Sequence, residues 1–300
     1  MSILKYKDAN GKPATLIAMT SLNRSEFEKL CIYFCDAWDA KTESEGRYPS
    51  GCGRKPRLTT MEDKLFFILF YLKTYPLQEV IAHLFDMSQG QANFWIHTLS
   101  KVLKDALHRK GYTPPRIPKD MLDRLGNEEL QDFAIDGTER KINRPIDNDV
   151  QKEFYSGKKK THTIKNNLVV GIEDRQIKYL GDTHEGKKHD KKICDEEEIK
   201  CPKNSVCYRD NGFQGYEMEE IDIREPKKKP RNGELTEEEK NNNKLISSLR
   251  VIVEHVISGA KRCRIVKDVF RNTKLGYDDL AMEIACGLHN YRSHFRLASY

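Results

Sequence analysis

Phe133-Ala-Ile-Asp-Gly-Thr138 is the stretch on which the interpretation of this sequence depends. It is a short apolar run that ends in an Asp-Gly pair, which is typical of a buried strand leading into a turn. An aspartate in a buried strand is costly unless it is paired or binds a metal ion. Asp136 is therefore either an ordinary turn residue or the first member of an acidic site.

A second apolar run ends in the same way. Val206-Cys-Tyr-Arg-Asp210 is followed by Asn-Gly-Phe, so Asp210 also lies at the end of a predicted strand. A turn residue is the simpler explanation for either aspartate alone. Two such acids in one region favour a site, because neighbouring strand ends bring their side chains together.

The third acid lies on a long predicted helix that begins at Thr236, in a capping box with Glu239, and runs to about Arg264. At about 100° per residue, one narrow stripe of this helix holds Ser247, Arg250, Glu254, Ser258 and Lys261. The opposite side is apolar and holds Leu245, Leu249, Ile252, Val253, Val256 and Ala260. The alternative to a functional stripe is a solvated face with helix ion pairs, each worth a few tenths of a kcal/mol.

Three carboxylates on two strands and a helix suit a site for two Mg²⁺ or Mn²⁺ ions, because these cations prefer oxygen ligands. Two such ions can activate a water molecule and stabilise the leaving oxygen of a phosphodiester. Asp136, Asp210 and Glu254 are therefore predicted to be both the catalytic residues and the metal ligands. Arg250 and Lys261 are predicted to bind phosphate beside them.

The surrounding segments predict a mixed α/β layer fold of the α+β type. Further strands are expected at Thr163 to Ile172, Gln176 to Leu180 and Tyr216 to Ile223. A short helix is expected at Lys191 to Glu198, and a last helix at Tyr277 to Arg296.

The first third of the chain has a helical pattern instead. Helices are expected at residues 22–40, from Met61 to Pro76, from Gln78 to Phe85, and after a capping box formed by Ser88 and Gln91. A short helix, a tight turn and a longer capped helix follow one another in a helix-turn-helix.

The first turn of this longer helix is polar, with Gln89, Gln91 and Asn93, and such amides can read base edges in a major groove. A three-helix bundle without a DNA partner has the same pattern. The predicted organisation is a helical DNA-binding domain at 1–110, a proline-containing linker at 111–130 and a catalytic domain at 131–300.

The composition permits a folded intracellular protein with a polyanionic partner. The chain has 300 residues, 38% of them hydrophobic, and a formal net charge of +6, a mild excess that does not by itself prove DNA binding. The longest apolar run, Leu65 to Leu72, is too short to cross a bilayer. We expect a soluble, cytoplasmic, nucleoid-associated protein with no membrane partner.

The eight cysteines form no C-x-x-C pair, so reduced thiols are expected rather than a zinc site.

The motifs Asp136-Gly-Thr, Asp210-x-Gly-Phe and Arg250-x3-Glu254-x6-Lys261 resemble those of bacterial insertion-sequence transposases of the DDE superfamily. Eukaryotic Harbinger-type transposases share the pattern. The resemblance covers nearly the whole chain and includes Gly-Lys-Lys-His-Asp190 ahead of the second acid. It departs from the pattern at Ser247, where these families often carry a tyrosine.

This resemblance implies an RNase H-like catalytic domain, bound Mg²⁺ or Mn²⁺, cleavage at terminal inverted repeats of double-stranded DNA, and transfer into a target site. It also implies a homo-oligomer on DNA. Two alternatives stay open: a non-catalytic DNA-binding regulator derived from a transposase, and a site-specific nuclease without strand transfer. His189 and Asp190 are placed either near the metals or in a simple loop. Gly53-Arg-Lys-Pro-Arg57 is either a minor-groove hook or a plain basic linker.

Overall fold

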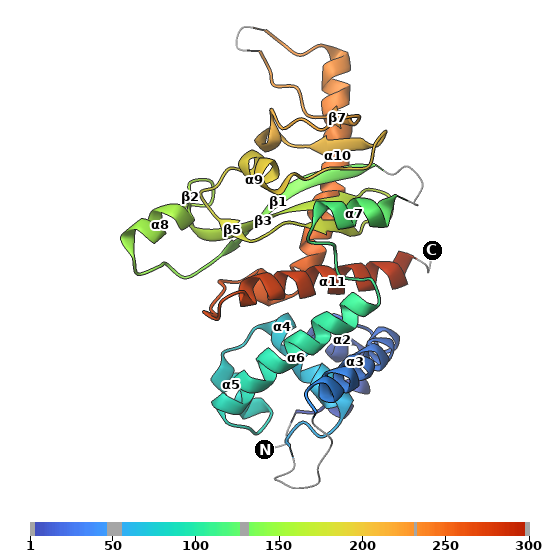
Figure 1. Ribbon diagram of the computed structural model, residues 1–300, viewed down its shortest axis with the longest axis vertical. Coiled ribbons are helices and arrows are strands. Elements are labelled where there is room, and N and C mark those ends of the chain that lie inside the picture. The colour runs from blue at the N-terminus through green and yellow to red at the C-terminus, as the bar shows by residue number, and fades with distance from the viewer. Residues whose placement is uncertain (1–3, 47–55, 127–131, 231–232, 298–300) are drawn as a thin grey trace. The chain divides into compact units, whose positions relative to one another are not determined.

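The computed structural model describes residues 4–46, 56–126, 132–230 and 233–297 (Figure 1). Residues 53–55 of the basic segment lie outside these ranges. The chain forms two compact units. The first consists of Met1–Thr113, Lys261–Asp268 and Asn272–Tyr300, and the second consists of Pro114–Ala260 and Val269–Arg271.

The first unit is helical. Its elements are α1 (Tyr6–Asn10), α2 (Pro13–Thr20), α3 (Arg24–Ser44), α4 (Met61–Thr74), α5 (Gln78–Leu84), α6 (Gln89–Arg109), the 3-10 turn η2 (Arg264–Val266) and α11 (Tyr277–Leu297). The last helix packs on α6, and the Tyr277 hydroxyl lies 2.9 Å from the Ser100 hydroxyl. The compact units differ from the expected domains in two ways. The segment expected to be a linker belongs to the second unit from Pro114 onward, and α11, expected in the catalytic domain, groups with the helical unit.

A buried helix holds the helix-turn-helix in place. Nearly all of α4 is buried, and its Phe67 ring packs edge-on against Phe85 at 4.9 Å between ring centroids. Phe85 lies in the turn between α5 and α6. Asp86 next to it adopts a left-handed conformation with φ 50°, and the Met87 amide donates to the Ala82 carbonyl at 3.0 Å. The turn is thus fixed from its core side.

The second unit is built on a mixed sheet. Its main strands are β1 (Phe133–Lys141), β3 (Thr161–Gly171), β4 (Ile177–Leu180), β6 (Val206–Arg209) and β7 (Asp222–Arg224), with the short β2 (Tyr155–Ser156) and β5 (His184–Glu185) beside β3. The strands β1, β3 and β4 pair antiparallel in succession, whereas β6 and β7 run parallel to β1 on its other side. This confirms the α+β class and the RNase H-like arrangement.

Helices flank this sheet in Figure 1. They are α7 (Pro118–Leu125), α8 (Asn148–Phe154), α9 (Asp190–Glu197), the 3-10 turn η1 (Asn211–Phe213) and α10 (Glu237–Ala260). Ile135 of β1, Val169 of β3 and Cys194 of α9 share one core. Because side chains alternate along a strand, Asp136 points to the opposite face from Ile135. The helix α10 contacts both β1 and β6.

Two predicted elements were wrong in extent. The strand expected from Tyr216 is confined to β7, because Tyr216 and Met218 are buried in the core from an irregular loop. The long helix ends at Ala260 and not at Arg264, because Ile265 and Val266 are fully buried in the 3-10 turn η2, which packs on α4.

The apolar face of α10 also differs from the predicted one. Leu245 is 50% exposed, and the buried residues of this helix include Ile246, Val253, Val256, Ile257 and Ala260.

The seven cysteines in the described part of the chain are free, as predicted. No helix among the described residues has the length and apolar character needed to span a membrane.

Candidate active site and nucleic-acid interface

The register of two parallel strands brings two of the predicted acids to the same place. Phe133 of β1 lies opposite Cys207 of β6, and Ile135 lies opposite Arg209. Continued by one residue, this register sets Asp136 against Asp210. Both carboxylates therefore follow directly from the last paired positions, at the carboxyl end of β6.

Each aspartate uses one oxygen to bind the backbone that follows it. Asp136 Oδ1 accepts from the Gly137 amide at 2.8 Å. Asp210 Oδ1 accepts from the Gly212 amide at 2.7 Å and caps η1. Asp210 Oδ2 lies 3.7 Å from Nη2 of Arg250 on α10. The turn role that the sequence suggested for Asp210 is thus real, and it leaves the second oxygen facing a cation.

The electrostatics of this pair are unfavourable without further positive charge. Burial, and after it the neighbouring charge of Asp210, raise the pKa of Asp136 to about 6. Arg250, the Gly137 amide and Lys158 act in the opposite direction. Two partly buried carboxylates this close together, of which Asp136 has a raised pKa and Asp210 turns Oδ2 towards a cationic side chain, fit the preference of Mg²⁺ or Mn²⁺ for oxygen ligands.

The third acid is less closely tied to the pair. Glu254 is an exposed residue of α10. Among the described residues, no group of three acidic, histidine or cysteine side chains is arranged to hold a metal ion. The structure therefore brings Asp136, Asp210 and Arg250 together, and the role of Glu254 stays a prediction. Lys261 comes one residue after α10 ends, so it does not continue the helical stripe that the sequence predicted.

Asp190 has a position that the sequence left open. A Cβ atom added to Gly137 would lie 3.1 Å from Asp190 Oδ1, and one added to Gly212 would lie 3.4 Å from Oδ2. The buried Lys165 holds this carboxylate with its Nζ atom at 3.0 Å from Oδ1. The Asp190 carboxylate thus approaches the backbone after both site aspartates. The two glycines that follow these acids in the sequence were the available sign of such a close approach.

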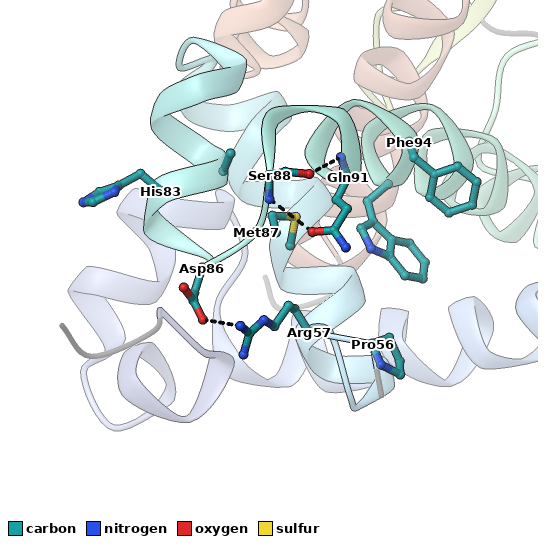
Figure 2. A pocket seen from close by; sticks show the side chains of 10 residues that line it. Pro56, Arg57, His83, Asp86, Met87, Ser88, Gln91 and Phe94 are labelled. Atoms are coloured by element: carbon teal, nitrogen blue, oxygen red, sulfur yellow. Dashed lines mark hydrogen bonds and ion pairs between the residues drawn. The ribbon is translucent and has the colours of Figure 1, made fainter. Parts of the chain in front are cut away.

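In the helical unit, the polar first turn of α6 is largely engaged inside the domain. The side-chain amides of Gln89 and Asn93 donate to Oε1 of Gln78 on α5, at 3.3 and 3.2 Å. Gln91 and Ser88 form the predicted capping box. Gln91 Oε1 accepts from the Ser88 amide at 3.1 Å, which leaves its Nε2 donor for a partner (Figure 2). Sequence reasoning missed Gln78, which fixes two of the three predicted base-reading amides.

An open hollow of about 590 Å³ lies beside the start of α6. Figure 2 shows Gln91 and Phe94 on one side of it and Arg57, in an ion pair with Asp86, on another. The Arg57 Nη2 atom lies 3.0 Å from Asp86 Oδ2. This surface therefore combines polar, charged and aromatic groups at the second helix of the helix-turn-helix.

Comparison with known proteins gives matches for both halves of the chain. Residues 135–290, more than half of the sequence, match a family described as DDE superfamily endonuclease. Residues 56–108 match the helix-turn-helix of DDE superfamily endonuclease. The chain is 29% identical over 239 residues to a probable transposase for insertion sequence element IS702 from Microchaete diplosiphon, covering 80% of this chain and 83% of that protein. No solved structure matches the chain.

Proposed function

Because the chain belongs to the DDE superfamily of endonucleases, we propose that it is a transposase that binds terminal inverted repeats and catalyses metal-dependent cleavage and strand transfer. The observation that carries this proposal is the placement of Asp136 and Asp210 at adjacent positions of parallel strands. The similarity to a probable insertion-sequence transposase over 80% of the chain supports it.

In this proposal Asp136, Asp210 and Glu254 are the ligands, each acting through carboxylate oxygen. Two Mg²⁺ or Mn²⁺ ions held there would supply positive charge that activates water and stabilises the leaving oxygen of the phosphodiester. Arg250 offsets the charge of the aspartate pair before DNA arrives and then orients phosphate. Lys261 holds a phosphate further along the DNA backbone.

In this proposal the helix-turn-helix recognises the ends of the insertion-sequence DNA, here called the element's ends. Its second helix, α6, presents Gln91 with a spare donor beside a surface that carries Arg57. Recognition helices of this kind place their N-terminal residues against base edges in a major groove. We propose that the protein acts on DNA as a homo-oligomer, because two ends must be processed together. Since its substrate is DNA, we also propose that it works at the nucleoid.

A joining assay separates this function from its two alternatives. Purified protein is mixed with labelled duplexes of the DNA that flanks the reading frame, a supercoiled target and Mg²⁺ or Mn²⁺. A transposase cleaves the ends and yields products joined to the target. A site-specific nuclease cleaves without joining, and a non-catalytic regulator binds the ends without cleaving them. Either of the last two outcomes would contradict the proposal.

A further inference from the structure

The second turn of α6 carries a large apolar side chain that is more than half exposed among the described residues. All of α6 lies in the described part of the chain, and Phe94 is its one large apolar side chain that is exposed, at 54%. Its ring meets Trp95 edge-on at 5.4 Å between centroids. Trp95 in turn is backed by Trp38 at 6.2 Å. Phe94 therefore projects outward from an ordered aromatic base.

The helix face around Phe94 is open to a partner. Gly90 lies one turn before Phe94, and a Cβ atom added there would meet nothing within 4 Å. Gln91, also one turn before, points its Nε2 donor away from the capping box. Polar and apolar recognition groups thus share one short stretch of the helix, in the orientation that Figure 2 shows.

Basic side chains lie on both sides of this ring, and the one on the first side, Arg57, is held in place by its ion pair with Asp86. Phe94 borders the hollow that contains Arg57 and a second hollow of about 580 Å³ that contains Lys101 and Lys274. Both lysines are exposed, and within the described residues no ion pair joins either of them to an acid. Cations flanking an outward-facing recognition helix suit the two phosphate backbones that border a groove.

The chemistry of the groove then identifies the contact. In the major groove, the base edges present donors, acceptors and a single kind of apolar group, the 5-methyl group of thymine. An exposed phenylalanine between these basic side chains has no other apolar partner in that groove. We propose that Phe94 is a specificity-determining residue whose ring packs against the 5-methyl group of a thymine in the recognition site, a role that rests on the proposed binding of DNA ends by this domain.

The test removes that methyl group without changing base pairing. Duplexes of the element's ends are prepared with each thymine in turn replaced by deoxyuridine, and the affinity of the full-length protein is measured by fluorescence anisotropy. One replacement should weaken wild-type binding about fourfold, as expected for the loss of one buried methyl group. The Phe94→Ala variant should bind the thymine and deoxyuridine duplexes equally at that position.

Two further variants control for folding and for general apolar loss. Phe94→Leu keeps an apolar group and should keep part of the preference for thymine. Ile32→Ala removes a similarly exposed apolar group, 56% exposed on α3, and should keep the full preference. Melting temperatures of all three should stay near that of the wild type, because each position is largely solvated.

The possible failures are distinguishable. If Phe94→Ala still binds the ends and keeps the thymine preference of the wild type, this inference is overturned and the proposed end recognition is not. Loss of self-association in Phe94→Ala, with an unchanged preference for thymine, assigns the ring to a protein interface and also overturns it. Equal affinity of the wild type for ends and for random DNA overturns the proposed end recognition, and this inference with it.

Discussion

The polar groups of α6 and the acids of β1 and β6 are satisfied in opposite ways. In α6, Gln89 and Asn93 share the Gln78 acceptor, and Ser88 and Gln91 cap each other. At the sheet, burial and Asp210 raise the pKa of Asp136 to about 6, with Arg250 as partial compensation. The first arrangement stabilises the apo fold, whereas the second costs stability and is typical of a site that awaits a cation.

Whether a polar side chain is hydrogen-bonded within the fold therefore does not by itself decide whether it can act on a partner. A recognition helix can keep its amides ordered within the domain and still offer a spare donor such as Gln91 Nε2. A catalytic carboxylate pair cannot be satisfied in advance without occupying the oxygens that its metals need.

The largest effect predicted for a basic side chain concerns Arg250, which lies beside Asp210. Arg250→Ala should lower cleavage of an end duplex about 100-fold, the loss expected when one fixed positive group that stabilises charge is removed. Lys261→Ala should also lower cleavage while leaving the melting temperature nearly unchanged. Lys244→Ala, which removes an exposed charge from the same helix, is the control. Wild-type cleavage by Arg250→Ala would mean that this face of α10 is only solvated, and wild-type cleavage by Lys261→Ala would remove Lys261 from phosphate binding.

The cost of the acid pair predicts a pH-dependent gain in stability. Because its folded-state pKa is raised to about 6, Asp136 stabilises the fold below its unfolded pKa and loses that contribution as pH rises through about 6. In EDTA at about pH 8, Asp136→Asn should therefore be more stable than the wild type by about 1–3 kcal/mol. At about pH 4 the two should be nearly equal. Urea unfolding at both pH values measures this, and a less stable variant at the higher pH would contradict the account.

The close approach of Asp190 predicts a packing defect next to the site. Gly137→Ala would put a methyl group 3.1 Å from Asp190 Oδ1 and 3.2 Å from Asn167 Oδ1. Overpacking of this kind costs about 1–3 kcal/mol, and it should also lower cleavage because Asp136 precedes the displaced residue. Gly157→Ala, with nothing within 4 Å of the added atom, is the matched control. Equal melting temperatures for the two variants would show that the site tolerates the shift.

The effects expected in the helix-turn-helix are on DNA binding and leave cleavage chemistry and folding stability aside. Gln89→Ala, Gln91→Ala and Asn93→Ala should weaken binding to element ends more than to random DNA, by about 1–3 kcal/mol for a full base contact. Gln91→Ala should have the strongest effect, because the side-chain amides of Gln89 and Asn93 already donate to Gln78 within the domain. A gel-shift titration on both DNAs measures the difference. Equal losses on the two DNAs would remove these amides from base recognition.

Local signals in the sequence predicted the elements well where capping and periodicity decide the structure. The Ser88–Gln91 box and the strand that begins near Phe133 are examples. The pairing of β1 with β6 joins residues more than 70 positions apart, so no local pattern could establish its register. The end of α10 and the exposure of Leu245 were likewise set by tertiary packing. Gln78 was missed, and the position of Asp190 was left open, because each acts through a contact that only the fold creates.

Asp136, Asp210 and Glu254 are proposed to perform metal-dependent cleavage together. The most direct measurement is cleavage of a labelled element end by the wild type and by Asp136→Ala, Asp210→Ala and Glu254→Ala, with Mg²⁺, Mn²⁺, Ca²⁺ or EDTA. We expect cleavage by the wild type with Mg²⁺ or Mn²⁺, inefficient cleavage with Ca²⁺ because of its looser coordination, and end binding without cleavage by each variant. Wild-type cleavage in EDTA, or full activity in any one of the three variants, would contradict this proposal.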